Sequence, residues 1–235
     1  MNKTDIEWCD FTWNPVTGCS RHCKNCFAHA IHNRRHKAYL DGKDVPEQYA
    51  KPFSEFQFFY ERLKEPIHRK KPAIIFVVDM GDLFDDNVPK HWIQQVIGVA
   101  GCCPQHIFMF LTKNPKRYQE FEFTDNCWLG TSITGEADMK RLAGWPLSNT
   151  NCKKFVSLEP ITGPANKISF YEFDLVIVGA MTGINPDPVS RDWFNGLRID
   201  NIFFKENIRR QVTGLPPGSK DQIRNPHLYR KVFEL

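Results

Sequence analysis

Three cysteines lie within eight residues of the chain, at Cys19, Cys23 and Cys26. Thiolates at this C-x3-C-x2-C spacing can each ligate one iron of a [4Fe-4S] cluster, which leaves the fourth iron open for a substrate or cofactor. A structural zinc site is the alternative, because His22 or His29 could supply a fourth ligand. A disulfide is disfavoured, since cysteines this close together would strain the bridge. The spacing favours an iron–sulfur cluster and leaves zinc open.

The N-terminus and the remaining cysteines indicate the cellular compartment. Residues 1–5 have no apolar run behind them, and nowhere are eighteen consecutive residues apolar, so the sequence predicts neither a signal peptide nor a membrane span. We therefore expect a cytoplasmic protein. In that reducing compartment Cys102, Cys103, Cys127 and Cys152 should be buried thiols, whereas Cys9 is ambiguous.

The size of the chain is that of one α/β domain. With 235 residues and 41% hydrophobic content it can bury one sizeable core, so we expect a single domain over 1–235 with a loop-like tail from about residue 211. Residues 43–71 are a less regular insertion. Their aromatic stripe at helical spacing favours a core-packed helix over a base-stacking platform, and consists of Phe53, Phe56, Phe59 and Leu63.

Apolar, β-branched runs alternate with helix-forming segments along the chain. We expect seven strands, within residues 6–13, 73–78, 106–112, 127–133, 154–159, 174–180 and 201–205. Helices are expected at 27–40 and 89–100 and within the connections 134–150 and 186–198. Such alternation indicates a parallel sheet with right-handed crossovers. The predicted fold class is α/β, a full or partial parallel (β/α) barrel that is TIM-barrel-like.

Polar residues and glycines follow the ends of these predicted strands. In a parallel barrel, catalytic groups collect at the C-terminal ends of the strands. After the three cysteines, the candidates in chain order are Gly81, Asp82, Lys113, Ser132, Ser157, Glu159, Gly179, Gly183 and Lys205. Singly, each glycine could serve only a tight turn, and a glutamate before Pro160 could be a solvated strand end. Their joint placement predicts that they line one mouth.

Six segments carry a family resemblance, at residues 6–26, 80–84, 111–115, 128–132, 157–160 and 203–205. With E-W-C-D-F-T-W-N-P-V-T-G-C over residues 7–19, the chain resembles the radical S-adenosylmethionine superfamily. It is more closely similar to the phage-associated radical-SAM-like family of uncharacterised proteins, whose members share this opening. It departs from the superfamily in having Asn25, not an aromatic residue, before the third cysteine, with Phe27 after it.

The resemblance implies two cofactors, a [4Fe-4S] cluster on the three cysteines and S-adenosylmethionine (SAM) chelating the open iron. Gly81 and Asp82 would receive the methionine amino group, and residues 176–183, with Gly179, are similar to the glycine motif beside the adenine. We assign the remaining candidates to cofactor binding as well. These are Lys113, Ser132, Ser157, Glu159 and Lys205.

The implied activity is radical chemistry, in which the reduced cluster cleaves SAM to a 5′-deoxyadenosyl radical that abstracts hydrogen from a substrate. A mouth lined by aromatic residues would exclude water, and the candidates are Trp13, Phe27, Phe84 and Trp128. The implied partners are a reductant such as flavodoxin or ferredoxin and a small molecule, nucleotide or nucleic acid as substrate. No membrane partner is expected.

Two other classes stay open, a noncatalytic iron–sulfur protein and a zinc-binding nucleic-acid module. The net charge of +4 permits a phosphate-bearing partner without requiring one. Two basic groups could flank the mouth and contact nucleic acid, or could be a solvated face. They consist of Lys113, Lys116 and Arg117, and of Arg34, Arg35 and Lys37.

Overall fold

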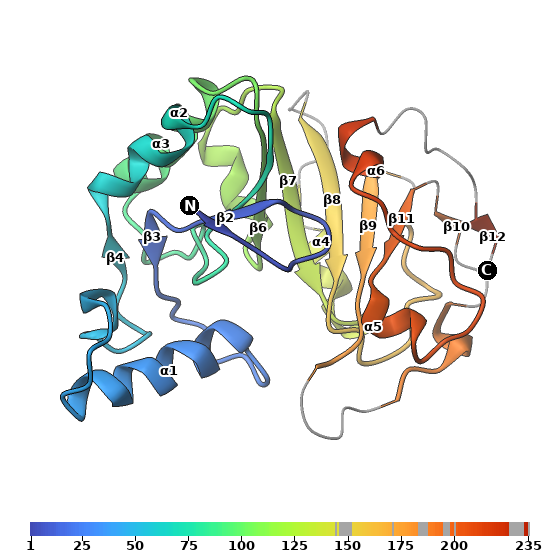
Figure 1. The fold of residues 1–235 in the computed structure, drawn as a ribbon. Coiled ribbons are helices and arrows are strands. Elements are labelled where there is room, and N and C mark those ends of the chain that lie inside the picture. The colour runs from blue at the N-terminus through green and yellow to red at the C-terminus, as the bar shows by residue number, and fades with distance from the viewer. Residues whose placement is uncertain are drawn as a thin grey trace.

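A single mostly parallel sheet forms the centre of the molecule. The computed structural model describes residues 1–143, 145, 152–170, 172–182, 188–194, 198–199, 201–225 and 233–234 (Figure 1). The sheet has eight strands in the order β1-β2-β5-β6-β7-β8-β9-β11. In that order they are Asn2–Lys3, Phe11–Trp13, Ile74–Val77, Ile107–Thr112, Cys127–Ile133, Lys153–Leu158, Leu175–Val178 and Ile202–Phe204. β1 is antiparallel to β2, and every later pair of neighbours is parallel.

The predicted parallel α/β architecture is therefore confirmed, but the sheet does not close. Within the described residues, β1 and β11 are its two edges and do not pair with each other. A full barrel, one of the two predicted alternatives, is thus not formed. The first predicted strand, residues 6–13, is shorter than expected and covers only β2, while the six later strands agree within two residues.

The strands alternate their side chains between two apolar layers. On β5, Val77 packs into the layer that also contains Ile93 of α3 (Lys90–Gly101). Phe76, its neighbour on the same strand, packs into the second layer with Trp8 from the N-terminal segment. Both faces of β5 are covered, which explains why this strand is a continuous apolar run.

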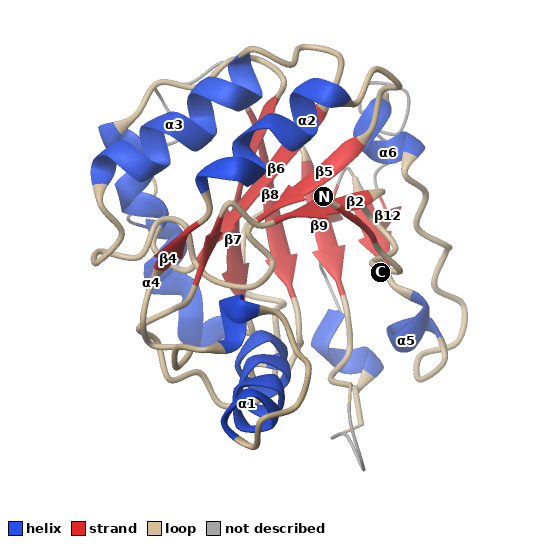
Figure 2. Cartoon of the chain, turned by 60° about the vertical axis from the view of Figure 1, so that its left-hand side comes forward, coloured by secondary structure: helices blue, strands red, loops and turns tan. Residues whose placement is uncertain are grey.

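α1 (Phe27–Leu40) and α3 confirm the two helices predicted before residue 101. The other helices are short, α2 (Glu65–His68), α4 (Met139–Ala143), α5 (Glu206–Arg209) and α6 (Asp221–Arg224). α1 lies apart from them, beyond the arrowheads of β7, β8 and β9, and therefore at the C-terminal end of the sheet (Figure 2). None of the helices in the described part of the chain is both long and apolar enough to cross a membrane.

Several predicted elements differ from the structure. The helix predicted within 43–71 is wrong, because β4 (Gln57–Phe58) pairs with β3 (Val16–Thr17) and divides that segment. In the described parts of connections 134–150 and 186–198, the helical elements are α4 and short 3-10 turns. The tail is not all loop, since it contains α6 and the strand β12 (Phe233–Glu234). β12 pairs with β10 (Arg198–Ile199).

Residues 4–10, which we call the N-terminal strap, cross in front of the open sheet toward β8 (Figure 1). Trp8 of the strap is buried in the second apolar layer. The Asp10 carboxylate then receives Lys220 Nζ at 2.8 Å and Arg224 Nη2 at 3.2 Å, both from the C-terminal part of the chain. The strap thus joins the beginning of the chain to its end by side-chain contacts.

Four of the five cysteines outside the loop of three are buried. They are Cys9, Cys103, Cys127 and Cys152. Cys102 is exposed, so the prediction of a buried thiol is wrong there. It is the residue that follows α3, where the helix ends at the surface.

Candidate functional site

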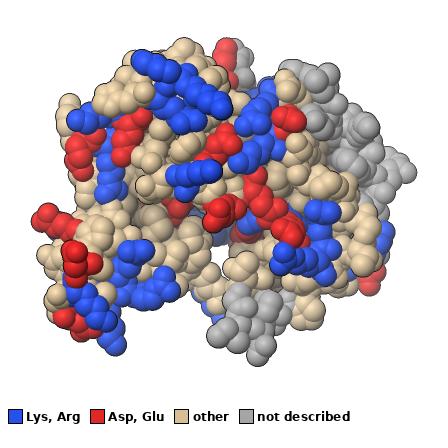
Figure 3. Space-filling model, in the orientation of Figure 1, with Lys and Arg blue, Asp and Glu red and all other residues tan. Residues whose placement is uncertain are grey.

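A cavity of about 580 Å³ lies at the C-terminal ends of the parallel strands, where the cysteine loop and α1 face the ends of β5 to β8. Figure 3 shows that the molecule is hollowed beside the part that contains α1. The candidates that line the cavity are Cys19, Cys23, Cys26, Gly81, Asp82, Lys113, Ser132 and Glu159. Ser157, Gly179 and Lys205 do not line it, and Gly183 lies outside the described residues.

The cysteine loop is fixed at its start by close backbone contacts with the end of β5. Gly18 N–H donates to Met80 O at 3.1 Å, and Gly18 also forms an isolated parallel bridge with Gly81. A Cβ on Gly81 would lie 2.5 Å from the Gly18 carbonyl oxygen, so only glycine permits this approach. On the other side, Cys19 N–H donates to Phe53 O at 3.0 Å. Gly81 therefore has a packing role that is independent of any cofactor.

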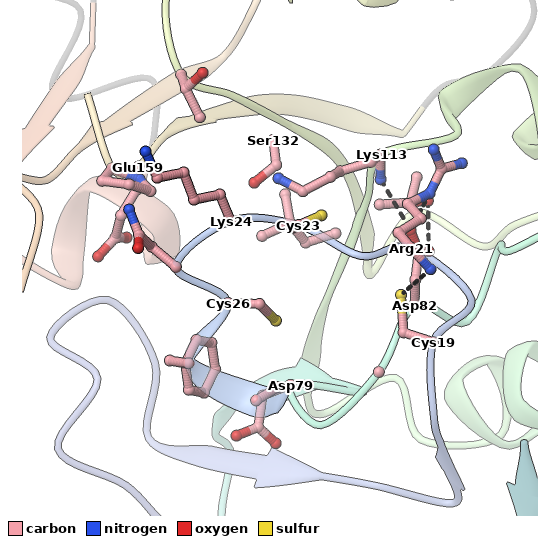
Figure 4. Close-up of a pocket in the computed structure, with 18 of the residues that line it drawn as sticks. Cys19, Arg21, Cys23, Lys24, Cys26, Asp79, Asp82, Lys113, Ser132 and Glu159 are labelled. Atoms are coloured by element: carbon pink, nitrogen blue, oxygen red, sulfur yellow. Dashed lines mark hydrogen bonds and ion pairs between the residues drawn. The ribbon is translucent and has the colours of Figure 1, made fainter. Parts of the chain in front are cut away.

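The three cysteine side chains stand around one space inside the cavity (Figure 4). The Cys19 sulfur accepts the Arg21 backbone N–H at 3.4 Å, and the Cys26 sulfur caps α1 by accepting His29 N–H at 3.5 Å. Among the described residues, no three His, Cys, Asp or Glu side chains converge to hold a single metal ion. Three sulfurs around a common space fit a cubane cluster, which takes each cysteine on a different iron.

Cys19 is the cysteine of the three that burial affects most. Desolvation raises the pKa of its thiol to about 12, against the lowering effect of the Arg21 N–H, and the nearby carboxylates Asp82 and Asp85 raise it further. The thiol is therefore protonated at neutral pH in the metal-free protein. Because a metal binds the thiolate, loading the site has to displace this proton.

Asp82 is a buried anchor for the chain around the cavity. Its carboxylate accepts hydrogen bonds from Thr112 Oγ1 at 2.6 Å, from Lys113 N at 3.1 Å and from Phe84 N at 3.1 Å. Arg21 Nε lies 3.7 Å from it. Burial raises the pKa of Asp82, while these donors act in the opposite direction. With its oxygens engaged in this way, Asp82 has little remaining capacity for a ligand.

Asp79, which the sequence does not single out, lines the cavity and its carboxyl group has no cationic partner in the described residues. It accepts a hydrogen bond from Asn14 Nδ2 at 2.6 Å and another from the Thr12 hydroxyl. Asn14 is itself held, because its Oδ1 accepts Met80 N–H at 3.0 Å. Burial raises the pKa of Asp79, and both hydrogen bonds act against that rise.

Glu159 and Lys205 form an ion pair between the ends of β8 and β11. Glu159 lines the cavity and Lys205 stands behind it. A Cβ on Gly179, at the end of β9, would lie 2.9 Å from Glu159 Cδ and 3.0 Å from Lys205 Cδ. Gly179 therefore leaves room for the ion pair, which is a structural reason for the glycine where the resemblance implies an adenine contact.

The aromatic residues predicted to line the mouth are mostly elsewhere. Phe27 lines the cavity and is 53% exposed, but Trp13, Phe84 and Trp128 are buried in the apolar layers. Their prediction as lining residues is wrong, because their side chains pack into the apolar layers on the two faces of the sheet. Phe27, in contrast, directly follows a ligand candidate.

The predicted basic surface also changes. Arg117 is 7% exposed, and its guanidinium donates to the carbonyl oxygens of Asp85 and Val88, so it stabilises the chain instead of facing solvent. The cavity has other polar residues that sequence reasoning missed, namely Arg21, Lys24, Asn25, Thr134, Asp138 and Arg141. The first three lie inside the cysteine loop, and that position was a usable signal. Of the last three, Thr134 and Asp138 lie between β7 and α4, and Arg141 lies on α4. The sequence contains no signal that would identify these three.

An open parallel α/β sheet with a cysteine-lined cavity at its C-terminal edge defines the general class of this protein. The chain matches, over residues 3–204, the model of the family described as "Protein of unknown function (DUF5131)", and it belongs to that family. No curated protein and no solved structure matches the chain.

Proposed function

We propose that the protein is a radical SAM enzyme that binds a [4Fe-4S] cluster through Cys19, Cys23 and Cys26. The observation that carries this proposal is the arrangement of the three cysteines around one space, in a cavity at the C-terminal edge of a parallel sheet. We interpret the open sheet and the N-terminal strap together as a partial, TIM-barrel-like barrel. In such folds, chemistry takes place at this edge of the sheet.

When bound, a reduced cluster and SAM would supply a radical that removes hydrogen from a substrate, for example a nucleotide or a nucleic-acid base. The chain's own part is to bind, orient and shield. Phe27, Phe53 and Leu111 give the cavity an apolar wall that excludes water from bound ligands. A cytoplasmic reductant such as flavodoxin or ferredoxin would deliver electrons near Cys23 and Cys26, which are only half-buried.

Asp79 is the best candidate in the chain for the SAM ammonium group. It lines the cavity, and its hydrogen-bond donors among the described residues are neutral, so an incoming cation would give it a charge-assisted contact. Asp82, which the resemblance suggests for this role, instead holds Thr112 and the Lys113 backbone in place.

The zinc alternative is less well supported by the surroundings of the loop. A fourth zinc ligand would have to come from His22 or His29, and the His29 ring is already engaged with Asn33 at 2.9 Å and packed beside Phe53. A noncatalytic cluster protein would not need a 580 Å³ cavity whose lining includes the three cysteines and Asp79, a carboxyl group without a cationic partner in the described residues.

Anaerobic reconstitution with iron and sulfide tests the proposal. We expect about four irons and four sulfides per chain. Cys23→Ala should lose this cluster, while Cys102→Ala, which removes an exposed cysteine far from the loop in sequence, should keep it. With a reductant and SAM, the intact protein should release 5′-deoxyadenosine. Binding of zinc without iron, or full iron content in Cys23→Ala, would overturn the proposal.

A further inference from the structure

Not every charged side chain in the cavity wall has a partner of opposite charge. Three of its carboxylates have a cationic partner, in the pairs Asp82–Arg21, Asp138–Arg141 and Glu159–Lys205. Two ammonium groups in the cavity, those of Lys24 and Lys113, have no acidic or hydrogen-bonding partner among the described residues. These two lysines are therefore unpaired cations in the described part of the wall, Lys113 half-exposed and Lys24 exposed.

Lys113 is held so that its side chain reaches into the cavity. Its backbone N–H donates to the buried Asp82 carboxylate at 3.1 Å, which fixes the residue at the end of β6. From there the side chain extends toward Ser132 and Cys23 (Figure 4). The residue is only half-exposed. A partly desolvated ammonium group without a counter-charge is unfavourable, and a bound anion would offset that cost.

Lys24 and Ser132 complete the same side of the cavity. Lys24 extends from the cysteine loop toward Glu159, and Ser132 faces the cavity from the end of β7 (Figure 4). The Ser132 hydroxyl has no hydrogen-bond partner in the part of the chain that the structure describes, so it can donate to a ligand. Two ammonium groups and a free hydroxyl are suited to a phosphate or carboxylate group.

The position of Asp79 separates this anion site from the cofactor. In Figure 4, Asp79 lies on one side of the cysteine sulfurs, and Lys24 and Lys113 lie on the other. The ammonium and carboxylate groups of SAM are attached to the same carbon atom. If Asp79 receives the ammonium group, the carboxylate group lies one carbon atom away from it, on the Asp79 side of the sulfurs in Figure 4. This arrangement leaves the two lysines for the anion of a different molecule.

We propose that Lys24, Lys113 and Ser132 form an anion-binding subsite for the substrate, which is a small molecule bearing a phosphate or carboxylate group. This inference rests on the proposed function, because it assigns the subsite to the substrate of the cofactor-bearing cavity. It replaces the extended basic surface expected from the sequence, since Arg117 is buried and internally bonded.

Calorimetric titration of the anaerobically reconstituted protein tests the subsite, with and without saturating SAM. The probes are inorganic phosphate, ribose 5-phosphate, succinate and, as a neutral match, ribose. We expect one of the anions to bind in both states and ribose not to bind. Lys24→Met/Lys113→Met should weaken anion binding by about 10- to 100-fold, the loss expected for charged hydrogen bonds. Lys116→Met, an exposed lysine outside the cavity, is the matched control and should bind as the wild type does.

Phosphate preferred over succinate would identify a phosphorylated substrate, and the reverse would identify a carboxylate. Unchanged anion binding in the double variant, or displacement of the anion by SAM, would overturn the inference. So would a single-stranded oligonucleotide that binds tightly without regard to the two lysines. Iron content and SAM affinity, measured on the same samples, keep the two proposals apart. A protein with cluster and SAM but no anion binding contradicts only the subsite, and lysine-dependent anion binding without a cluster contradicts only the radical enzyme.

Discussion

Two carboxyl groups three residues apart, Asp79 and Asp82, have different environments although both follow β5. Asp82 is surrounded by donors from the chain itself, Thr112 and two backbone N–H groups among them. Asp79 accepts hydrogen bonds from the neutral side chains of Asn14 and Thr12 and lines the cavity. The local sequence cannot distinguish them, because their donors come from strands that are distant in the chain. Their roles can be separated by experiment.

We predict that Asp79→Asn weakens SAM binding by about 10- to 100-fold while leaving the stability of the fold nearly unchanged. Asp82→Asn should do the reverse, with a loss of about 2–4 kcal/mol in the free energy of unfolding, because Thr112 and the Lys113 N–H lose a charged acceptor. Urea denaturation and anaerobic SAM titration of both variants check this. Equal loss of SAM affinity in both would return the ammonium site to Asp82.

The pH dependence of SAM binding follows from the same environment. Burial raises the pKa of Asp79, so its negative charge is lost at a higher pH than for an exposed aspartate. Wild-type affinity should therefore fall as the pH is lowered toward that pKa. The Asp79→Asn variant, which carries no charge at any pH, should lack this component of the pH dependence.

At the scale of elements, the cysteine loop depends on how closely three segments approach. Gly18, with φ of +106°, stands between the backbone of Gly81 and that of Glu55, where a Cβ would lie 2.7 Å from Glu55 O. Gly18, Gly81 and Glu55 lie outside the helices and strands of the structure, so a prediction of helices and strands from the sequence does not reveal this contact. The loop is held in place by backbone fit, so its geometry should be sensitive to a single methyl group.

We predict that Gly81→Ala displaces the cysteine loop and lowers the iron content after reconstitution, with a loss of about 1–3 kcal/mol in the free energy of unfolding. The reason is the 2.5 Å distance between the new Cβ and Gly18 O. Gly98→Ala in α3 is the matched control, since a Cβ there meets nothing within 4 Å. That variant should keep its iron and be as stable as the wild type or slightly more so. Full iron content in Gly81→Ala would contradict the packing role.

The helix α1 is attached to the segment 46–53 by histidines rather than by an apolar stripe. His32 Nε2 lies 2.8 Å from Lys51 O, and His36 Nδ1 lies 2.7 Å from Tyr49 O. The His32 ring is 2% exposed and packs beside Phe53, whose carbonyl oxygen holds Cys19. Protonation of His32 should therefore loosen the support of the cysteine loop.

We predict that acid weakens the fold through His32. Burial lowers its pKa from the ordinary value of 6.5, and His36 and His29 lower it further. The unfolded chain then binds more protons, so the contribution to stability is present above pH 6.5 and is lost as the pH falls through the lowered pKa. In thermal melts from pH 8 to 5, His32→Gln should be less stable than the wild type at pH 8, by about 1–3 kcal/mol, and should show a smaller further loss in acid. If wild type and His32→Gln lost the same amount of stability between pH 8 and pH 5, the acid sensitivity would belong to another group.

The sequence predicted α1, α3 and the six later strands of the parallel sheet because their patterns are local and continuous. It failed for residues 43–71, where Phe53, Phe56 and Phe59 lie in turns and loops and Leu63 lies in a 3-10 turn. At the site, the cysteines and their strand-end neighbours could be identified by spacing. Asp79, Arg141 and Asp138 could not, because their significance depends on which strands lie side by side.

For the molecule as a whole, the open sheet makes the N-terminal strap a structural necessity. Trp8 fills the second apolar layer beside Phe76 and Phe155, with ring centroids 4.7 Å and 6.3 Å away. Glu7 Oε2 accepts the Glu206 N–H at 2.8 Å, at the start of α5. These contacts join residues before β2 to residues after β11. They connect the two sides of the sheet although its edge strands, β1 and β11, are not hydrogen-bonded to each other. The sequence does not show this, since the contacting residues are about 200 positions apart.

We predict that the strap is stabilised by Asp10 in a pH-dependent way. Burial alone would raise the pKa of Asp10, but the Ile74 N–H, Lys220 and Arg224 outweigh it and lower the pKa below 3.8. A lowered carboxylate pKa contributes stability that is present above the unfolded value and is lost as the pH falls through the folded one. Asp10→Asn should therefore be less stable than the wild type at pH 7 by about 1 kcal/mol, a modest value because Lys220 and Arg224 are partly exposed. The difference in the free energy of unfolding should shrink below pH 4, as measured in urea denaturation curves of both proteins.

The control is Asp221→Asn, which removes an exposed partner of Arg224 outside the strap and should change stability little at either pH. A constant difference between wild type and Asp10→Asn at pH 7 and pH 3 would mean that the ion pairs of Asp10 do not hold the strap.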